Sequence, residues 1–266
     1  MIRVMSFNIR YGLADDGENH WHHRKALALA RIRAFVPDLL GLQECRDDDQ
    51  AEFVRAHLPD YHFLGCHRQG PGDTALEMAP LLFRRSAFAL LDTGCFWLSE
   101  TPEVPGSTSW DSAYPRTVTW ARLASRPTGA VLTYVNTHFD YQPAAIAGDA
   151  RCLRHWLDQL GRETPLIVTG DFNTDRASDA YRLLTGDGAL IDTFRQTHPL
   201  GADDATFHAF GQPEPGEMTA IDWILASAQF RVLEAQIDRS RQGNLFPSDH
   251  YPITAVLAWQ DAPLTA

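Results

Sequence analysis

The chain has 266 residues, 44% of them hydrophobic, and its 23 Lys and Arg against 34 Asp and Glu give a net charge of −11. This length and composition favour one α/β domain with a large core, spanning residues 1–266. Duplex DNA is bound mainly through neutralisation of its phosphates by Lys and Arg, so tight binding of duplex DNA is not expected. No apolar stretch approaches the length of a membrane span and no signal peptide is evident, which predicts a soluble, cytoplasmic protein with no membrane partner.

Strand-like and helical patterns alternate along the chain. Short apolar runs predict strands at residues 2–8, 38–43, 79–84, 86–92, 117–123, 130–137, 165–169, 220–226 and 253–259. Amphipathic stretches predict helices at 22–35, 48–58 and 144–160. Several of the strands follow one another directly, so a pair of mixed sheets with helices outside fits better than a purely parallel doubly wound sheet.

Three loop-rich segments interrupt this pattern, at residues 14–20, 69–73 and 100–114. The third is long for a connection without secondary structure, and long loops of this kind often contact substrate. A solvated surface loop would have the same composition, so both interpretations stay open for it.

The four cysteines are widely scattered and form no CxxC pair. This spacing gives no support to a zinc knuckle or a redox motif, and it predicts four reduced, packed thiols. The cysteines are Cys45, Cys66, Cys95 and Cys152.

Polar residues recur at or near the ends of the strand-like runs. The clearest case is Gly170-Asp171-Phe172-Asn173, which follows the apolar run 166–168; the two polar side chains are two positions apart and can therefore face one centre. Such a segment alone is also typical of a turn. Five further segments repeat the pattern, which indicates one shared site: Ser6-Phe7-Asn8, Gln43-Glu44, Asn136-Thr137-His138, Asp222 and Ser248-Asp249-His250.

The acidic members of these segments predict a metal site. They are Glu44, Asp171, Asp222 and Asp249. Two carboxylates about 5 Å apart at an effective dielectric constant near 20 repel by roughly 3 kcal/mol, so such a cluster needs protons, basic partners or a cation. Oxygen ligands with the amides of Asn8 and Asn173 beside them suit Mg²⁺ or Mn²⁺ better than zinc, and such ions often complete their shell with phosphate oxygens.

Two histidines are candidates for acid and base catalysis. His138 and His250 lie in the polar segments, and an imidazole that titrates near neutral pH can activate water or assist a departing oxygen. A catalytic histidine usually has a carboxylate that fixes its tautomer, and Asp222 and Glu77 are available for this role. The sequence leaves open which histidine acts as acid and which as base.

Taken together, the six segments resemble the endonuclease/exonuclease/phosphatase superfamily, whose members have a deoxyribonuclease I-like fold. Two of the matching segments extend further here, to Ile221-Asp222-Trp223 and Ser248-Asp249-His250-Tyr251-Pro252, and the resemblance covers residues 6–252. It implies a four-layer α/β/β/α sandwich of two mixed sheets with outer helices and an active site at one rim.

The resemblance also implies roles for the residues that could bind metal and substrate. Glu44 resembles the principal metal ligand, with Asn8 beside it, and Asp249 resembles a second acidic position near the metal. Arg116, in Tyr114-Pro115-Arg116-Thr117, is similar to an arginine that reaches the substrate phosphate, a role that suits its planar guanidinium.

For the reaction itself, the resemblance implies that Asp171 and Asn173 handle the attacking water and the phosphate. Asp222 resembles the partner that orients His250. Glu77 is similar to the acid that pairs with His138, which would contact the phosphate or protonate the leaving group.

Other segments resemble a bacterial branch of the superfamily. These are Phe7-Asn8-Ile9-Arg10-Tyr11, Asn19-His20-Trp21-His22-His23-Arg24-Lys25, Phe96-Trp97-Leu98-Ser99-Glu100-Thr101-Pro102 and Thr206-Phe207-His208. This branch implies no particular substrate. His208 and Asp140 are further candidates for the site, although a structural hydrogen bond is an equal alternative for each.

The expected function is that of a metal-dependent phosphoesterase, which hydrolyses a phosphodiester or phosphomonoester bond in a small or medium-sized substrate by activated water. An alternative is a nuclease acting on single-stranded or short nucleic acid, with Trp21, Trp97 and Trp110 as base-stacking surfaces. A non-catalytic binding module is a weaker alternative, because the family positions are filled by chemically competent residues.

Overall fold

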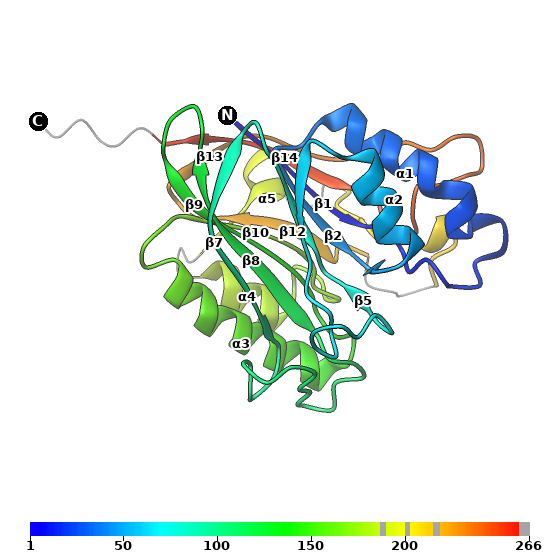
Figure 1. The fold of residues 1–266 in the computed structure, drawn as a ribbon, viewed down its shortest axis with the longest axis horizontal. Coiled ribbons are helices and arrows are strands. Elements are labelled where there is room, and N and C mark those ends of the chain that lie inside the picture. Colours follow the sequence, from blue (N-terminus) through cyan, green and yellow to red (C-terminus); the bar gives the residue numbers. More distant parts are fainter. Residues whose placement is uncertain (187–189, 200–202, 215–218, 261–266) are drawn as a thin grey trace, which may run out of the picture.

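The computed structural model describes residues 1–186, 190–199, 203–214 and 219–260. Two six-stranded sheets lie face to face with helices on their outer sides, as the resemblance implied (Figure 1). The first sheet has the order β13 (Phe230–Ile237), β14 (Ile253–Trp259), β1 (Ile2–Asn8), β2 (Leu39–Gln43), β6 (Leu81–Arg84), β4 (Tyr61–Leu64). The second has the order β11 (Ile191–Asp192), β12 (Asp222–Ala226), β10 (Leu166–Asp171), β9 (Val131–His138), β8 (Thr117–Ser125), β7 (Phe88–Trp97).

Both sheets are mixed, because β1 pairs in parallel with β2 and β9 with β10, while the other pairs in the two sheets are antiparallel. A small two-stranded sheet joins β3 (Cys45–Arg46) to β5 (Glu77–Met78). The helices are α1 (Trp21–Phe35), α2 (Asp49–His57), α3 (Pro143–Leu160), α4 (Asp179–Thr185) and α5 (Thr193–Thr197), with short 3-10 turns at η1 (Gly17–Asn19) and η3 (Ala209–Gly211).

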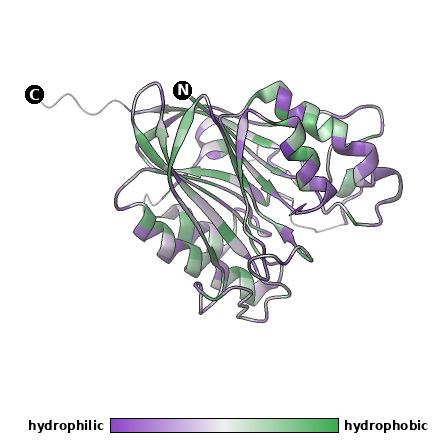
Figure 2. Ribbon diagram, viewed as in Figure 1, coloured by the Kyte–Doolittle hydropathy of each residue, from purple (hydrophilic) through white to green (hydrophobic). Residues whose placement is uncertain are grey.

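The core has three layers of apolar contacts. Along β1, Ile2 and Val4 face the second sheet, whereas Met5 and Phe7 face α1 and α2, as expected from the alternation of side chains along a strand. Both faces of β1 are therefore buried, which explains its nearly continuous apolar run. On the other side of the molecule, the Leu153 and Leu157 stripe of α3 packs against the second sheet. Figure 2 shows apolar residues along the inner strands and mixed faces on the outer helices.

The strand register brings the polar segments to one rim. Asn8 stands beside Gln43 on the parallel pair β1 and β2. In the other sheet, Asp171 lies between His138 on β9 and Asp222 on β12. The two sheets meet at this rim through a hydrogen bond of 2.9 Å from Asn8 Nδ2 to Asp171 Oδ2. Strand ends that are far apart in sequence thus form one polar edge.

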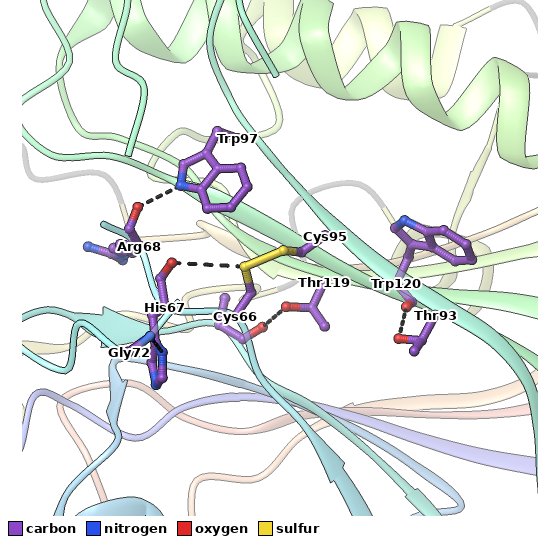
Figure 3. Close-up of a disulfide and its surroundings, with 10 residues drawn as sticks. Cys66, His67, Arg68, Gly72, Thr93, Cys95, Trp97, Thr119 and Trp120 are labelled. Carbon is purple, nitrogen blue, oxygen red and sulfur yellow. Dashed lines mark hydrogen bonds between the residues drawn. A yellow bond between two sulfur atoms is a disulfide. The ribbon is translucent and has the colours of Figure 1, made fainter. Parts of the chain in front are cut away.

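The prediction of four reduced cysteines is wrong for two of them. Cys66 and Cys95 form a disulfide, with Cα atoms 6.4 Å apart and a separation of 29 positions (Figure 3). Cys66 follows β4 and Cys95 lies on β7, which are edge strands of the two different sheets, so the bond joins the sheets at that edge. The pairing arises from the stacking of the sheets, which the spacing of the cysteines in sequence does not reveal. Cys45 and Cys152 are free.

Among the described residues, no helix has the length and apolar character needed to cross a bilayer. The expectation of one domain over 1–266 includes residues 261–266, which lie outside the described residues.

Candidate active site

A cavity of about 580 Å³ opens at the polar rim. Most of the side chains proposed from the sequence line it: Glu44, Glu77, Arg116, His138, Asp171, Asn173, Asp249 and His250. Asn8 and Asp222 lie behind this lining, with exposed fractions of 0% and 1%. The structure therefore brings the proposed residues into one neighbourhood.

At the centre of the site, Glu44, Asp171 and His250 each offer a ligand atom, and these atoms lie within 4.8 Å of one another. The amide of Asn8 donates to Glu44 Oε1 and to Asp171 Oδ2, both at 2.9 Å, and so bridges the two carboxylates. The oxygen of the same amide accepts from the backbone N–H of Arg10 at 2.9 Å. Asn8 is thus at the site as expected, and its described contacts are those of a bridge between the acidic residues.

Two residues of the site have left-handed backbone conformations. Glu44 has φ 58° and Asn173 has φ 48°. Asparagine tolerates this region, but for glutamate it is uncommon, and such conformations occur often at functional sites. Contacts at both positions offset the strain: Glu44 Oε2 accepts from the backbone N–H of Tyr11 at 2.7 Å, and the Asn173 amide donates to the Phe139 carbonyl at 2.8 Å.

His250 is held between two carboxylates. Its Nδ1 lies 2.8 Å from Asp222 Oδ2, and its Nε2 lies 3.8 Å from Asp171 Oδ2. Burial by itself would lower the pKa of His250, but the charges of Asp222 and Asp171 and the hydrogen bond to Asp222 outweigh it and raise the pKa to about 10. Burial and the charge of Asp222 also raise the pKa of Asp171, to about 7. The charges of Asp222 and Asp171 thus favour the protonated form of His250, whereas burial disfavours the ionised form of Asp171.

His138 lies on the other side of Asp171, and its neighbours differ from those of His250. Its Nε2 is 3.5 Å from Asp171 Oδ2, and its Nδ1 is 3.3 Å from Nη2 of Arg68. Nη1 of the same arginine lies 2.8 Å from Glu77 Oε1. Arg68 thus stands between Glu77 and His138, where the resemblance implied a direct pair. Burial, followed by the charges of Arg116 and Arg68, lowers the pKa of His138 well below its usual value.

Arg116 lines the cavity and is held in place by the buried carboxylate of Asp140. Its Nε lies 3.2 Å from Asp140 Oδ2, and Asp140 also accepts from the backbone N–H groups of Ala113 and Tyr114. Among the described residues, no group accepts from the buried Nη1 of Arg116. A buried donor without a partner in a cavity is suited to an anionic ligand. Asp140 is thereby explained as the residue that orients Arg116.

The remaining candidates lie at the margin of the site. Asp249 lines the cavity, but it lies outside the group of close ligand atoms; its Oδ2 is 3.5 Å from Nε of Arg10, and its Oδ1 accepts from the Ser248 hydroxyl at 3.1 Å. His208 stacks on Tyr251 and its Nδ1 accepts from the backbone N–H of Gly211. These contacts favour the structural alternative for His208.

The donor set at the centre fits a divalent cation. Two carboxylates and one imidazole nitrogen converge there, and a cation would neutralise the repulsion between Glu44 and Asp171. The residues that would hold it are Glu44 and Asp171, with His250 beside them.

The chain is similar to known proteins in both sequence and fold. The model of the Endonuclease/Exonuclease/phosphatase family matches residues 5–250. A family member from Bacteroides vulgatus has a similar crystal structure, with 34% identity and a TM-score of 0.87, over 97% of this chain and 99% of the other. The Bacteroides thetaiotaomicron mannosyl-6-phosphatase is 28% identical with a TM-score of 0.86, over 97% and 100% of the two chains. Rat nocturnin is 22% identical over 98% of this chain and 67% of its own length.

Proposed function

Because this chain belongs to the endonuclease/exonuclease/phosphatase family, we propose that it is a phosphoesterase that requires Mg²⁺ or Mn²⁺ and hydrolyses a small phosphoester with activated water. The observation that carries the proposal is the composition of one cavity. On one side the ligand atoms of Glu44, Asp171 and His250 lie within 4.8 Å of one another, and the same cavity is lined by Arg116, whose Nη1 has no described acceptor. This combination suits a phosphate that bridges a cation and a guanidinium.

The size of the cavity supports a small substrate. A volume of about 580 Å³ lies in the usual range for pockets that bind small molecules, roughly 300–1,000 Å³. The net charge of −11 supports the same choice, because it disfavours long polyanions. The similarity to a mannosyl-6-phosphatase makes a sugar phosphate the first compound to test.

In the proposed reaction, water attacks the phosphorus opposite the departing oxygen. A bound cation would stabilise charge on the phosphate and lower the pKa of a bound water. Asp171 and the pair of Asp222 and His250 orient the attacking water. A cation held by Glu44 and Asp171 would offset part of the negative charge that keeps His250 protonated, so that His250 could accept the proton of the water. Arg116 and Asn173 stabilise the charge that develops on the phosphate.

A nuclease acting on single-stranded or short nucleic acid is the second candidate. Tyr114 and Tyr141 line the cavity with exposed fractions of 45% and 51%, and exposed rings of this kind can stack on bases. The expected stacking role of Trp21 and Trp97 is wrong, because these side chains are only 2% and 5% exposed and pack in the interior. Trp110 packs against Gly148 of α3, and Arg151 lies over its ring.

One set of assays separates the two candidates. The protein is incubated with Mg²⁺ or Mn²⁺ and a hexose 6-phosphate, a small phosphodiester, a short single-stranded oligonucleotide or plasmid DNA. We expect turnover of a small ester and intact plasmid, and loss of turnover in Asp171→Asn. Cleavage of the oligonucleotide alone would support the nuclease. Equal rates for Asp171→Asn and the unmodified protein would contradict the assignment of the site.

A further inference from the structure

We propose that Arg68 is a positioning residue of this site: it fixes the tautomer of His138, and the Cys66–Cys95 disulfide holds Arg68 in place. The sequence alone did not single out this arginine. The consequence for turnover rests on the proposed phosphoesterase activity, whereas the tautomer and the anchoring of the loop are properties of the protein without substrate.

The contact between Arg68 and His138 determines where the imidazole hydrogen lies. Arg68 Nη2 is 3.3 Å from Nδ1 of His138. A guanidinium donates hydrogen bonds and cannot accept them, so Nδ1 must be the accepting nitrogen. A neutral imidazole with an accepting Nδ1 has its hydrogen on Nε2. That nitrogen lies 3.5 Å from Asp171 Oδ2, so the N–H of His138 is directed to the centre of the site.

His250 has the opposite arrangement. Its Nδ1 faces the Asp222 carboxylate, which can only accept when it is ionised, so Nδ1 carries a hydrogen there. The Nε2 of His250 is then the nitrogen that faces Asp171 and the site. The two histidines on either side of Asp171 are therefore not interchangeable: His138 directs an Nε2 hydrogen toward the site, whereas His250 directs an Nδ1 hydrogen away from it, to Asp222.

Arg68 is buried and paired with an acidic residue, which restricts its guanidinium to one position. The side chain of Arg68 is 1% exposed, and its charge is balanced by Glu77 at 2.8 Å. One guanidinium nitrogen of Arg68 contacts Glu77 and another contacts His138. The flexible ammonium group of a lysine would reproduce this pair of contacts poorly. Glu77 therefore acts on His138 through Arg68 and not by direct contact.

Two links to β7 hold the loop that carries Arg68. Cys66, two positions before it, is bonded to Cys95, and the indole Nε1 of Trp97 donates to the Arg68 carbonyl (Figure 3). Both links come from the last three residues of β7, an edge strand of the second sheet. The disulfide therefore fixes the loop to the sheet that also carries His138 on β9.

The disulfide is accessible to a reductant. Cys66 and Cys95 are both partly exposed, and they line a second cavity, of about 440 Å³, with His67 and Trp97. A small dithiol that enters there would supply two electrons and two protons. The bond between the two sulfur atoms would break to give two thiols, while the dithiol would be oxidised to its own disulfide. The hydrogen bond from Trp97 would then be left as the link between Arg68 and β7 in Figure 3.

The tautomer is tested by NMR of the full chain labelled with ¹⁵N-histidine and kept free of metal. We expect the His138 signals of an imidazole protonated at Nε2, assigned by their loss in His138→Gln. In Arg68→Met/Glu77→Gln, which removes the buried charge pair as a unit, we expect a mixture of tautomers. A hydrogen on Nδ1 of His138 in the unmodified protein would overturn the proposal. This readout needs no substrate, so it stands apart from any failure of the phosphoesterase assignment.

The kinetic test uses Arg68→Lys and a disulfide-free variant, Cys66→Ser/Cys95→Ser. With the phosphoester found above, we expect at least a tenfold fall in kcat for Arg68→Lys and a smaller change in KM. Dithiothreitol should lower the kcat of the unmodified protein by several-fold and leave the disulfide-free variant, already slow, unchanged. Cys152→Ser, at a free cysteine of α3, is the matched control and should respond like the unmodified protein. Full reduction of the disulfide, shown by thiol titration, with unchanged kcat and unchanged His138 signals would refute the anchoring role.

Discussion

Asp222 and His250 are in contact across 28 sequence positions, with Oδ2 of the aspartate 2.8 Å from Nδ1 of the histidine. Asp222 is the first residue of β12 and is 1% exposed, so it is a fixed point from which the imidazole is oriented. The contact leaves Nε2 of His250 facing Asp171. In the proposed reaction, these three side chains act together on the attacking water.

Replacing Asp222 with Asn should lower kcat by two to four orders of magnitude, because the amide keeps the shape of the carboxylate but loses the charge that supports a protonated His250. KM should change by less than threefold, since Asp222 is behind the cavity wall. Steady-state kinetics and thermal unfolding of the purified variant provide the measurement. A variant that stays folded and retains more than a tenth of the original kcat would contradict the role of this pair.

Removal of divalent metal should abolish turnover. Treatment with EDTA followed by desalting should leave less than a hundredth of the activity, and added Mg²⁺ or Mn²⁺ should restore it, since the proposed cation at Glu44 and Asp171 would stabilise the charge on the phosphate. Glu44→Gln should raise the metal concentration needed for half-maximal activity at least tenfold. Asp158→Asn, a half-exposed carboxylate on α3, is the control and should behave like the unmodified protein. Undiminished activity without metal would exclude the proposed cation.

Much of the rim could be predicted from the sequence because it depends on strand register. Polar residues that end apolar runs lie side by side where two parallel strands end together. Asn8 lies beside Gln43 in this way, and His138 lies beside Asp171. By contrast, β13 was not predicted. Its eight residues alternate irregularly between buried and exposed because it is an edge strand with a bulge between Val232 and Glu234, so its apolar pattern is weak.

The contacts that the sequence did not predict are those made by loops and edges. Arg68 follows a short edge strand in a segment with no pattern of its own, and the disulfide between Cys66 and Cys95 links this segment to β7. The role of Asp140 was equally open. Its carboxylate is used by Arg116 and by the backbone of residues 113 and 114, contacts that exist only once the end of the 100–114 loop lies against the segment that follows β9. Such contacts join distant segments and leave no periodic signal.

Arg116→Lys should weaken substrate binding. The planar guanidinium of Arg116 contacts Asp140 through Nε and at the same time offers the unpaired Nη1 to the cavity. A lysine keeps the charge but cannot make both contacts. We expect KM for the phosphoester, and the inhibition constant of inorganic phosphate, to rise about tenfold. Arg122→Lys is a matched control on the neighbouring strand β8, because Arg122 pairs with Glu163 at 2.8 Å away from the cavity. Equal effects of the two substitutions would argue against a phosphate contact by Arg116.

Asp149 should make the stability of the protein depend on pH. This residue of α3 is 0% exposed, and burial raises its pKa from the ordinary 3.8 to about 7. Below pH 3.8 the carboxyl is neutral in both the folded and the unfolded chain, so it has no effect. Between pH 3.8 and about 7 the unfolded chain loses this proton while the folded protein retains it, so the free energy of unfolding falls as pH rises.

Asp149→Asn should remove this contribution, because an amide does not ionise and its oxygen can still accept from the backbone N–H of Asp140, which lies 2.9 Å from Asp149 Oδ2. One pKa unit corresponds to about 1.4 kcal/mol, so relative to the unmodified protein the variant should gain up to a few kcal/mol between pH 4.5 and pH 8. Urea unfolding at the two pH values measures the difference in the free energy of unfolding between the variant and the unmodified protein. The titration of the other groups, which both proteins share, cancels in this difference. Asp158→Asn on the same helix should show no such gain, since its carboxylate is 50% exposed. A difference between Asp149→Asn and the unmodified protein that is the same at both pH values would mean that Asp149 is ionised in the folded state across this range.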